Sequence, residues 1–141
     1  MDINQELILS LSKLNKAIQI ASRTQDYIIK IHAKNTKELD DIWELRDLAI
    51  DLRDYFEGNI HNFNFEVWQD IDSDNTNRLL VNSIHHASNA ILQWCYSIEN
   101  SCDGLTYMLN TCDKLITRLL SKLQERTYQY ETLLQTKRRV R

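Results

Sequence analysis

Apolar residues recur at alternating intervals of three and four positions along most of this chain. The longest such pattern spans residues 76–134 and is interrupted once, by the polar residues 99–104. Its positions are Leu80, Ile84, Ala87, Ile91, Trp94 and Ile98, followed by Leu105, Met108, Cys112, Leu115, Leu119 and Lys122. Residues at this spacing share one side of a helix, and that side has to be buried against other helices. The pattern therefore predicts helices near 76–99 and 104–136 that form an antiparallel hairpin.

Two further stripes precede this hairpin. The first is heptad-like and consists of Leu7, Leu11, Leu14, Ile18, Ala21, Gln25, Ile28 and His32. The second consists of Leu39, Ile42, Leu45, Ala49, Leu52 and Phe56. They predict helices near 3–33 and 36–57, and the short connection between them places the two helices side by side and antiparallel.

Together the four stripes predict an all-α fold, a four-helix up-down-up-down bundle with long first and last helices. One alternative stays open at this point. Gly104 inside a continuous helix costs only about 1 kcal/mol. With that helix unbroken, the chain would be an elongated helical coiled-coil oligomer.

Composition supports a single helical domain. The 141 residues include no proline and two glycines, and 43% of them are hydrophobic. We assign residues 1–136 to one helical bundle domain and residues 137–141 to a basic C-terminal tail. The three cysteines lack CxxC spacing, which favours reduced thiols. The start of the chain does not resemble a signal peptide, and no transmembrane segment is expected, so we expect a soluble protein of the cytoplasm or nucleus.

Charge is distributed unevenly along the sequence. Residues 36–75 carry twelve acidic and three basic side chains, whereas residues 121–141 carry six basic and two acidic ones. Residues 1–35 have a net charge of +2. This pattern predicts an acidic second helix beside more basic first and last helices. The alternative interpretation is an acidic face that binds a basic partner.

Sequence motifs for metal or cofactor chemistry are incomplete or missing. Residues 70–75 have alternating carboxylates like a calcium loop, but Asn75 stands where glycine is required, and Val81 stands where the bidentate glutamate is required. There is no HExxH pattern, no Cys/His spacing suited to zinc and no glycine loop that could hold phosphate. We therefore expect no metal and no cofactor.

The long apolar stripes favour a non-enzymatic protein–protein interaction module, such as an adaptor, an inhibitor or a subunit of a larger assembly. The expected partner is a helical protein, with a homodimer as an open alternative, and nucleic acid is not expected. The candidate binding residues are Leu7 and Leu11 in the first helix and three aromatic residues, Phe63, Phe65 and Trp68. The aromatic residues either plug one end of the bundle or form an exposed patch.

One pair of residues suggests a different class of function. Arg78 and His85 are seven positions apart, so they lie on the same side of one helix. This spacing resembles the Arg-x(4–6)-His element of HEPN domains, which are small helical bundles that include dimeric RNases. The family's element has a polar residue after the arginine, where this chain has Leu79. The resemblance implies a dimeric RNA-binding or RNase domain, in which the histidine acts in proton transfer and the arginine stabilises phosphate charge.

This alternative predicts that the purified protein cleaves RNA. His85→Ala should abolish cleavage, because alanine cannot transfer the proton. Cleavage of a labelled single-stranded RNA is the measurement, with circular dichroism showing that the variant keeps its helices. Equal activity of the two proteins, or none in either, contradicts the nuclease hypothesis.

Overall fold

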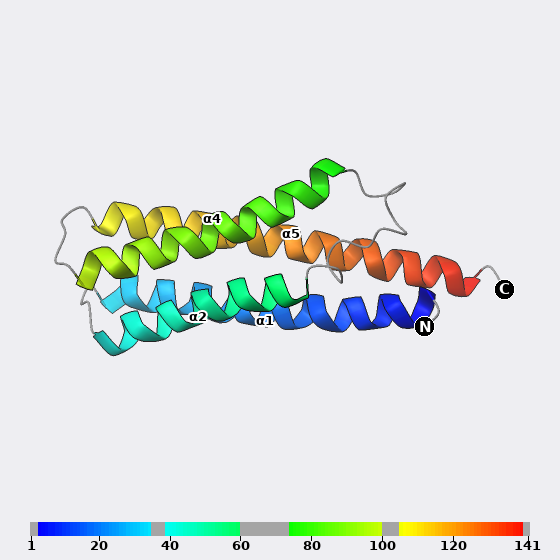
Figure 1. The fold of residues 1–141 in the computed structure, drawn as a ribbon, viewed down its shortest axis with the longest axis horizontal. Coiled ribbons are helices and arrows are strands. Elements are labelled where there is room, and N and C mark those ends of the chain that lie inside the picture. The colour runs from blue at the N-terminus through cyan, green and yellow to red at the C-terminus, as the bar shows by residue number, and fades with distance from the viewer. Residues whose placement is uncertain (1–2, 35–38, 60–73, 100–104, 140–141) are drawn as a thin grey trace.

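The chain forms four long helices that run alternately up and down (Figure 1). The computed structural model describes residues 3–34, 39–59, 74–99 and 105–139. The helices are α1 (Ile3–Lys34), α2 (Leu39–Gly58), α4 (Asp74–Glu99) and α5 (Leu105–Arg139). With 32 and 35 residues, α1 and α5 are the longest. The predicted four-helix bundle with long first and last helices is confirmed.

Each helix packs against the next one along the chain, and α5 closes the bundle by packing against α1. In Figure 1, α1 and α2 form one layer, α4 and α5 form the other, and both chain termini lie at the same end. Because α4 ends at Glu99 and α5 returns antiparallel from Leu105, the alternative of one continuous rod is wrong. α5 continues to Arg139, so its backbone includes part of the segment assigned to the basic tail.

The described helices are amphipathic, and none of them has a stretch long and apolar enough to cross a membrane.

The cores of α2 and α4 follow the stripes predicted from the sequence. Nine predicted positions are at most 1% exposed, namely Ile42, Leu45, Ala49, Leu52 and Phe56 in α2, and Ile84, Ala87, Ile91 and Trp94 in α4. The sequence also predicts burial of Leu39, Leu80 and Ile98, whose side chains lie outside the described set. These two helices alternate large apolar residues with polar ones, so their inward sides can be recognised from spacing alone.

In α1 the buried side is rotated relative to the predicted stripe. Half of that stripe is in the core, namely Leu7, Leu14, Ala21 and Ile28, but the other core positions are Ser10, Ala17, Thr24 and Ile31. Two of the residues predicted in their place instead form hydrogen bonds to α5. Gln25 Nε2 donates to Thr117 Oγ1 at 2.8 Å, and the ring of His32 bonds Asn110 Oδ1 at 2.5 Å. A helix with two neighbours buries the side that lies between them, and small residues there allow close approach.

α5 shows a similar difference in register. Cys112 and Leu119 are buried as predicted, but Ile116 and Leu123 fill the core, where the sequence pattern indicated Leu115 and Lys122. The predicted side chains of Leu105 and Met108 lie outside the described set.

The corrected register of α5 brings a charged residue into the interior. Arg126 is only 2% exposed, and Tyr130, one turn later, is 1% exposed. Burial lowers the pKa of the Arg126 guanidinium, whose carbon lies 5.9 Å from the centre of the Tyr130 ring. A lowered pKa means that folding disfavours the charged form, and contacts with Tyr130 counteract part of this cost.

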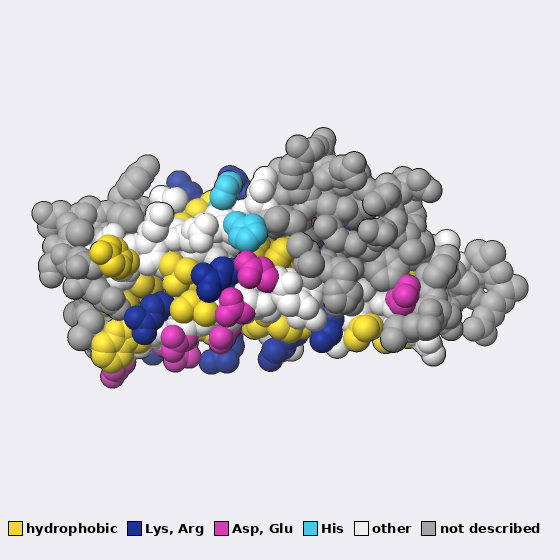
Figure 2. Space-filling model, in the orientation of Figure 1, with side chains coloured by type: hydrophobic (Ala, Val, Ile, Leu, Met, Phe, Trp, Pro, Cys, Tyr) yellow, Lys and Arg dark blue, Asp and Glu magenta, His cyan; other side chains and the backbone are white. Residues whose placement is uncertain are grey.

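The predicted pairing of a basic first helix with an acidic second helix is present. Lys30 Nζ lies 3.3 Å from Asp41 Oδ1, and Arg23 Nη2 lies 3.7 Å from Glu44 Oε1. Acidic and basic side chains alternate along the lower side of the face shown in Figure 2. The last helix does not share this pairing, because α5 packs mainly on α1 and α4.

The register of α5 can be tested with two neighbouring substitutions. Ile116→Ala should lower the free energy of unfolding by about 2–5 kcal/mol, since it removes a fully buried side chain and leaves a cavity. Leu115→Ala should cost only about 1 kcal/mol, because Leu115 is half-buried. Urea unfolding followed by circular dichroism measures both. A larger loss at Leu115 would contradict the register described here.

Candidate protein-binding groove

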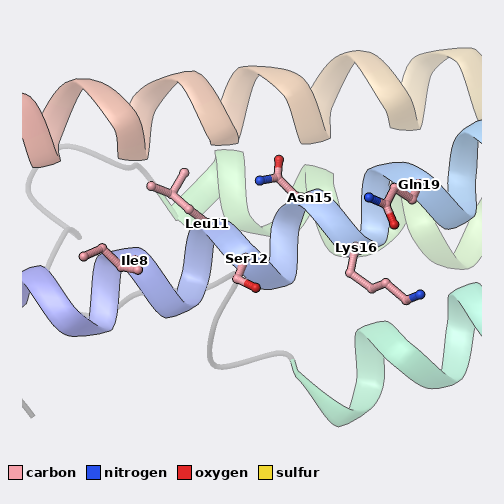
Figure 3. Close-up of a pocket in the computed structure, with 6 residues that line it drawn as sticks. All are labelled: Ile8, Leu11, Ser12, Asn15, Lys16 and Gln19. Atoms are coloured by element: carbon pink, nitrogen blue, oxygen red, sulfur yellow. The ribbon is translucent and has the colours of Figure 1, made fainter.

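The outward side of α1 is hollowed along part of its length. A groove of about 470 Å³, the α1 groove, is lined by Ile8, Leu11, Ser12, Asn15, Lys16 and Gln19. In Figure 3, Leu11 and Asn15 point toward α5, whereas Ser12 and Lys16 point toward the α2 side. Successive lining positions are one or three residues apart along a single helix, so the groove runs parallel to the helix axis.

A second hollow continues from the first into the seam between α1 and α2. This α1/α2 groove has a volume of about 590 Å³ and is lined by Lys16, Gln19, Ile20 and Arg23 of α1 and by Leu48, Asp51, Asp54, Tyr55 and Asn59 of α2. Lys16 and Gln19 line both hollows. The two grooves therefore form one continuous surface on this side of the bundle.

The α1/α2 groove has an apolar floor between two charged rims. Ile20, Leu48 and Tyr55 supply the apolar surface. The Tyr55 hydroxyl donates to the carbonyl of Lys13 at 3.3 Å and so holds α2 against α1. Burial raises the pKa of Tyr55, which keeps the hydroxyl neutral and able to donate.

The two rims carry opposite charge. Lys16 and Arg23 project from the α1 side, and Asp51 and Asp54 from the α2 side. Arg23 lies 3.7 Å from Glu44 and Asp54 lies 3.3 Å from Arg53. A ligand that covers the apolar floor therefore meets mainly the charges of Lys16 at one edge and Asp51 at the other. Such an arrangement selects the orientation of a charged partner more than it adds affinity.

One exposed aliphatic residue, Ile8, lines the α1 groove near the start of the helix. Ile8 is 49% exposed and Leu9 is 38% exposed, although both are large aliphatic residues. Exposed aliphatic residues are common on protein surfaces, and Ile29 at 53% is such a case. Ile8 differs because it lines a groove together with the half-buried Leu11.

The predicted binding residues have different environments. Leu7 is 0% exposed and belongs to the core, whereas Leu11 lines the α1 groove. The aromatic candidates Phe63, Phe65 and Trp68 lie outside the described residues. The sequence pattern did not predict that α2 contributes one side of the groove. The opposite net charges of the first two helices were the available signal.

The two residues of the HEPN-like element both lie on α4, as their spacing predicts. The side chain of His85 is half-buried, and that of Arg78 lies outside the described set. The catalytic role of this pair stays a prediction.

The two described cysteines lie in the core. Cys95 and Cys112 are buried and form no disulfide, and the Cys95 thiol donates to the carbonyl of Ile42 at 3.6 Å. Burial raises the pKa of Cys112 to about 12, so its nucleophilic thiolate is almost absent near neutral pH. Within the described ranges, no three His, Cys, Asp or Glu side chains come together as a metal site would require.

Comparisons of this chain with protein-family models, with curated proteins and with solved structures give no match. Its function is therefore inferred from the groove residues themselves.

The raised pKa of Cys112 makes stability depend on alkaline pH. Between the ordinary thiol value of 9.0 and about 12, the unfolded chain loses this proton while the folded chain keeps it. The free energy of unfolding should therefore fall as pH rises through this window, with up to about 1.4 kcal/mol per pH unit from Cys112.

Cys112→Ala should reduce this slope, measured by urea unfolding between about pH 9 and 11. Leu115→Ala is the matched control, because it weakens the same helix but retains the thiol. If Cys112→Ala and the wild type lose stability in parallel over this range, the buried thiol does not have the raised pKa.

Proposed function

We propose that this protein is a non-enzymatic helical interaction module, an adaptor, inhibitor or subunit of a larger assembly, that binds a helix of its partner along α1. The observation that carries the proposal is the continuous groove formed by the α1 groove and the α1/α2 groove. Its apolar residues, including Ile8, Leu11 and Ile20, follow the axis of one helix. Side chains of a partner helix pack into a surface of this kind as ridges into grooves.

The shape of the groove favours a helix over other occupants. The lining residues of α1 extend from Ile8 to Arg23, so the groove spans about four turns. A small molecule requires an enclosing cavity with convergent polar groups, whereas this surface lies open along the bundle. An amphipathic helix with apolar residues at every third or fourth position matches both its length and its apolar floor.

The energetics require contacts along the whole groove. Covering the exposed half of Ile8 contributes on the order of 1 kcal/mol. A micromolar complex needs a net free energy of about 8 kcal/mol after the cost of association. Several apolar contacts therefore have to act together, and a substitution at one of them should weaken binding without abolishing it.

A photo-crosslinking side chain at Ser12 tests this proposal in extract of the source cells. Ser12 is exposed within the α1 groove, and Ser121 is an exposed serine of α5 that serves as the matched control. We expect one discrete adduct from position 12 and none from position 121. Adding Ile8→Asp should reduce the adduct about tenfold, because a carboxylate at that position opposes apolar contact.

Circular dichroism has to show that Ile8→Asp leaves the bundle intact, as expected for a residue that is 49% exposed. If position 12 yields no adduct, or if its adduct is unaffected by Ile8→Asp in a folded protein, α1 is not the binding surface.

A further inference from the structure

We propose that a second copy of this chain covers the α1/α2 groove. The resulting homodimer has a two-fold axis parallel to the helices, so that Lys16 of each copy pairs with Asp51 of the other. This inference rests on the proposed function, because it identifies the partner that covers the surface of α1.

The first observation is the separation of charge between two helices of one layer. α1 contains five basic and two acidic side chains and has a net charge of +3. α2 contains two basic and seven acidic side chains and has a net charge of −5. These helices lie side by side in Figure 1. A net basic helix beside a net acidic one can be complementary to a second copy of the same pair.

The second observation is that the intramolecular pairing of these charges is incomplete. Toward one end of the layer, Lys30 and Arg23 are matched by Asp41 and Glu44. At the groove, Lys16 and Asp51 are both exposed, and neither forms an ion pair with any residue that the structure describes. These two rim residues are therefore accessible to another molecule.

Symmetry decides which residues meet. Rotation about an axis parallel to the helices places α1 of one copy over α2 of the other and preserves every position along the axis. An axis across the helices would instead place α1 over α1 and α2 over α2, with like charges opposed. The charge balances of α1 and α2 therefore select the parallel axis.

The register within one copy then determines the pair. Tyr55 contacts the backbone of Lys13, so these two residues are at the same level along the layer. One turn back along α2 is Asp51, and one turn forward along the antiparallel α1 is the region of Lys16. The two-fold rotation thus brings Lys16 of one copy opposite Asp51 of the other, and it does so twice in each dimer.

The apolar floor lies beside these charges. Ile20 and Leu48 line the same groove between the two rims. Leu48 is only 5% exposed and Ile20 packs against the core, so each copy already covers most of this apolar surface itself. The charges therefore specify how the two copies are oriented, and salt should weaken an association that depends on them.

Charge reversal in the chain of 141 residues tests this dimer, with sedimentation equilibrium at low salt as the measurement. The wild type should approach twice the chain mass of 16.7 kDa as its concentration rises. Lys16→Glu and Asp51→Lys alone should each weaken self-association roughly tenfold or more, because like charges then face each other twice. The matched controls are Lys114→Glu and Glu125→Lys on α5, both at exposed positions, and they should have no effect.

Two restorations identify the pair itself. Lys16→Glu combined with Asp51→Lys in one chain should associate like the wild type. An equimolar mixture of the two single variants should also associate, because the introduced glutamate of one chain faces the introduced lysine of the other. In that mixture the native Lys16 and Asp51 form the second pair.

If the wild type remains monomeric up to about 1 mM, the second-copy inference is wrong. A dissociation constant of that size corresponds to a free energy of association of only about 4 kcal/mol. Failure of both restorations overturns the Lys16–Asp51 pairing. The crosslink at Ser12 separates these failures from failure of the proposed function. If the protein is monomeric but its Ile8-dependent adduct contains a different protein, the interaction module stands and only the homodimer is wrong. If the protein is monomeric and gives no adduct, both proposals are wrong.

Discussion

The packing of the first helix against the last is the constraint on which the rest of this bundle depends. α1 and α5 make the most extensive helix–helix contact in the structure. The hydrogen bonds between them join residues 78 and 92 positions apart, so this contact forms only when the whole chain has folded back on itself. The fully buried Ala17 and Ala21 on α1 give the neighbouring helices room to approach closely. α2 and α4 pack against each other and form the other half of the core.

Polar groups in the interior limit how the helices can be arranged. Thr24 satisfies its buried hydroxyl by donating to the carbonyl of Ile20 at 2.8 Å. The hydroxyls of Ser10 and Ser88 are buried and find no hydrogen-bond partner among the described residues, at a cost of about 1–3 kcal/mol each. Arg126 adds the cost of a desolvated guanidinium. Such groups lower stability, and the large apolar residues of α2 and α4 have to offset them.

The groove is a consequence of the same packing. Since the buried side of α1 is centred on Leu7, Leu14 and Ala21, the helix turns Ile8 and Lys16 outward. The contact of Tyr55 with Lys13 holds α2 beside this outward side. The core of the bundle therefore determines which apolar residues remain accessible to a partner, and the charges of α1 and α2 border them.

The sequence by itself determined the helical fold, the number and approximate bounds of the helices, and the inward sides of α2 and α4. Residues such as Ile42 and Trp94 are large and apolar, and polar residues surround them, so their burial follows from the periodicity of one helix. The tertiary structure alone decided that Ser10 and Ala17 lie in the core while Leu11 lies at its edge, and that Ile116 replaces Leu115. It also decided that Lys16 and Asp51 border one groove. The physical reason is that a helix between two neighbours buries the side facing both of them, and the position of that side depends on residues far away in the sequence.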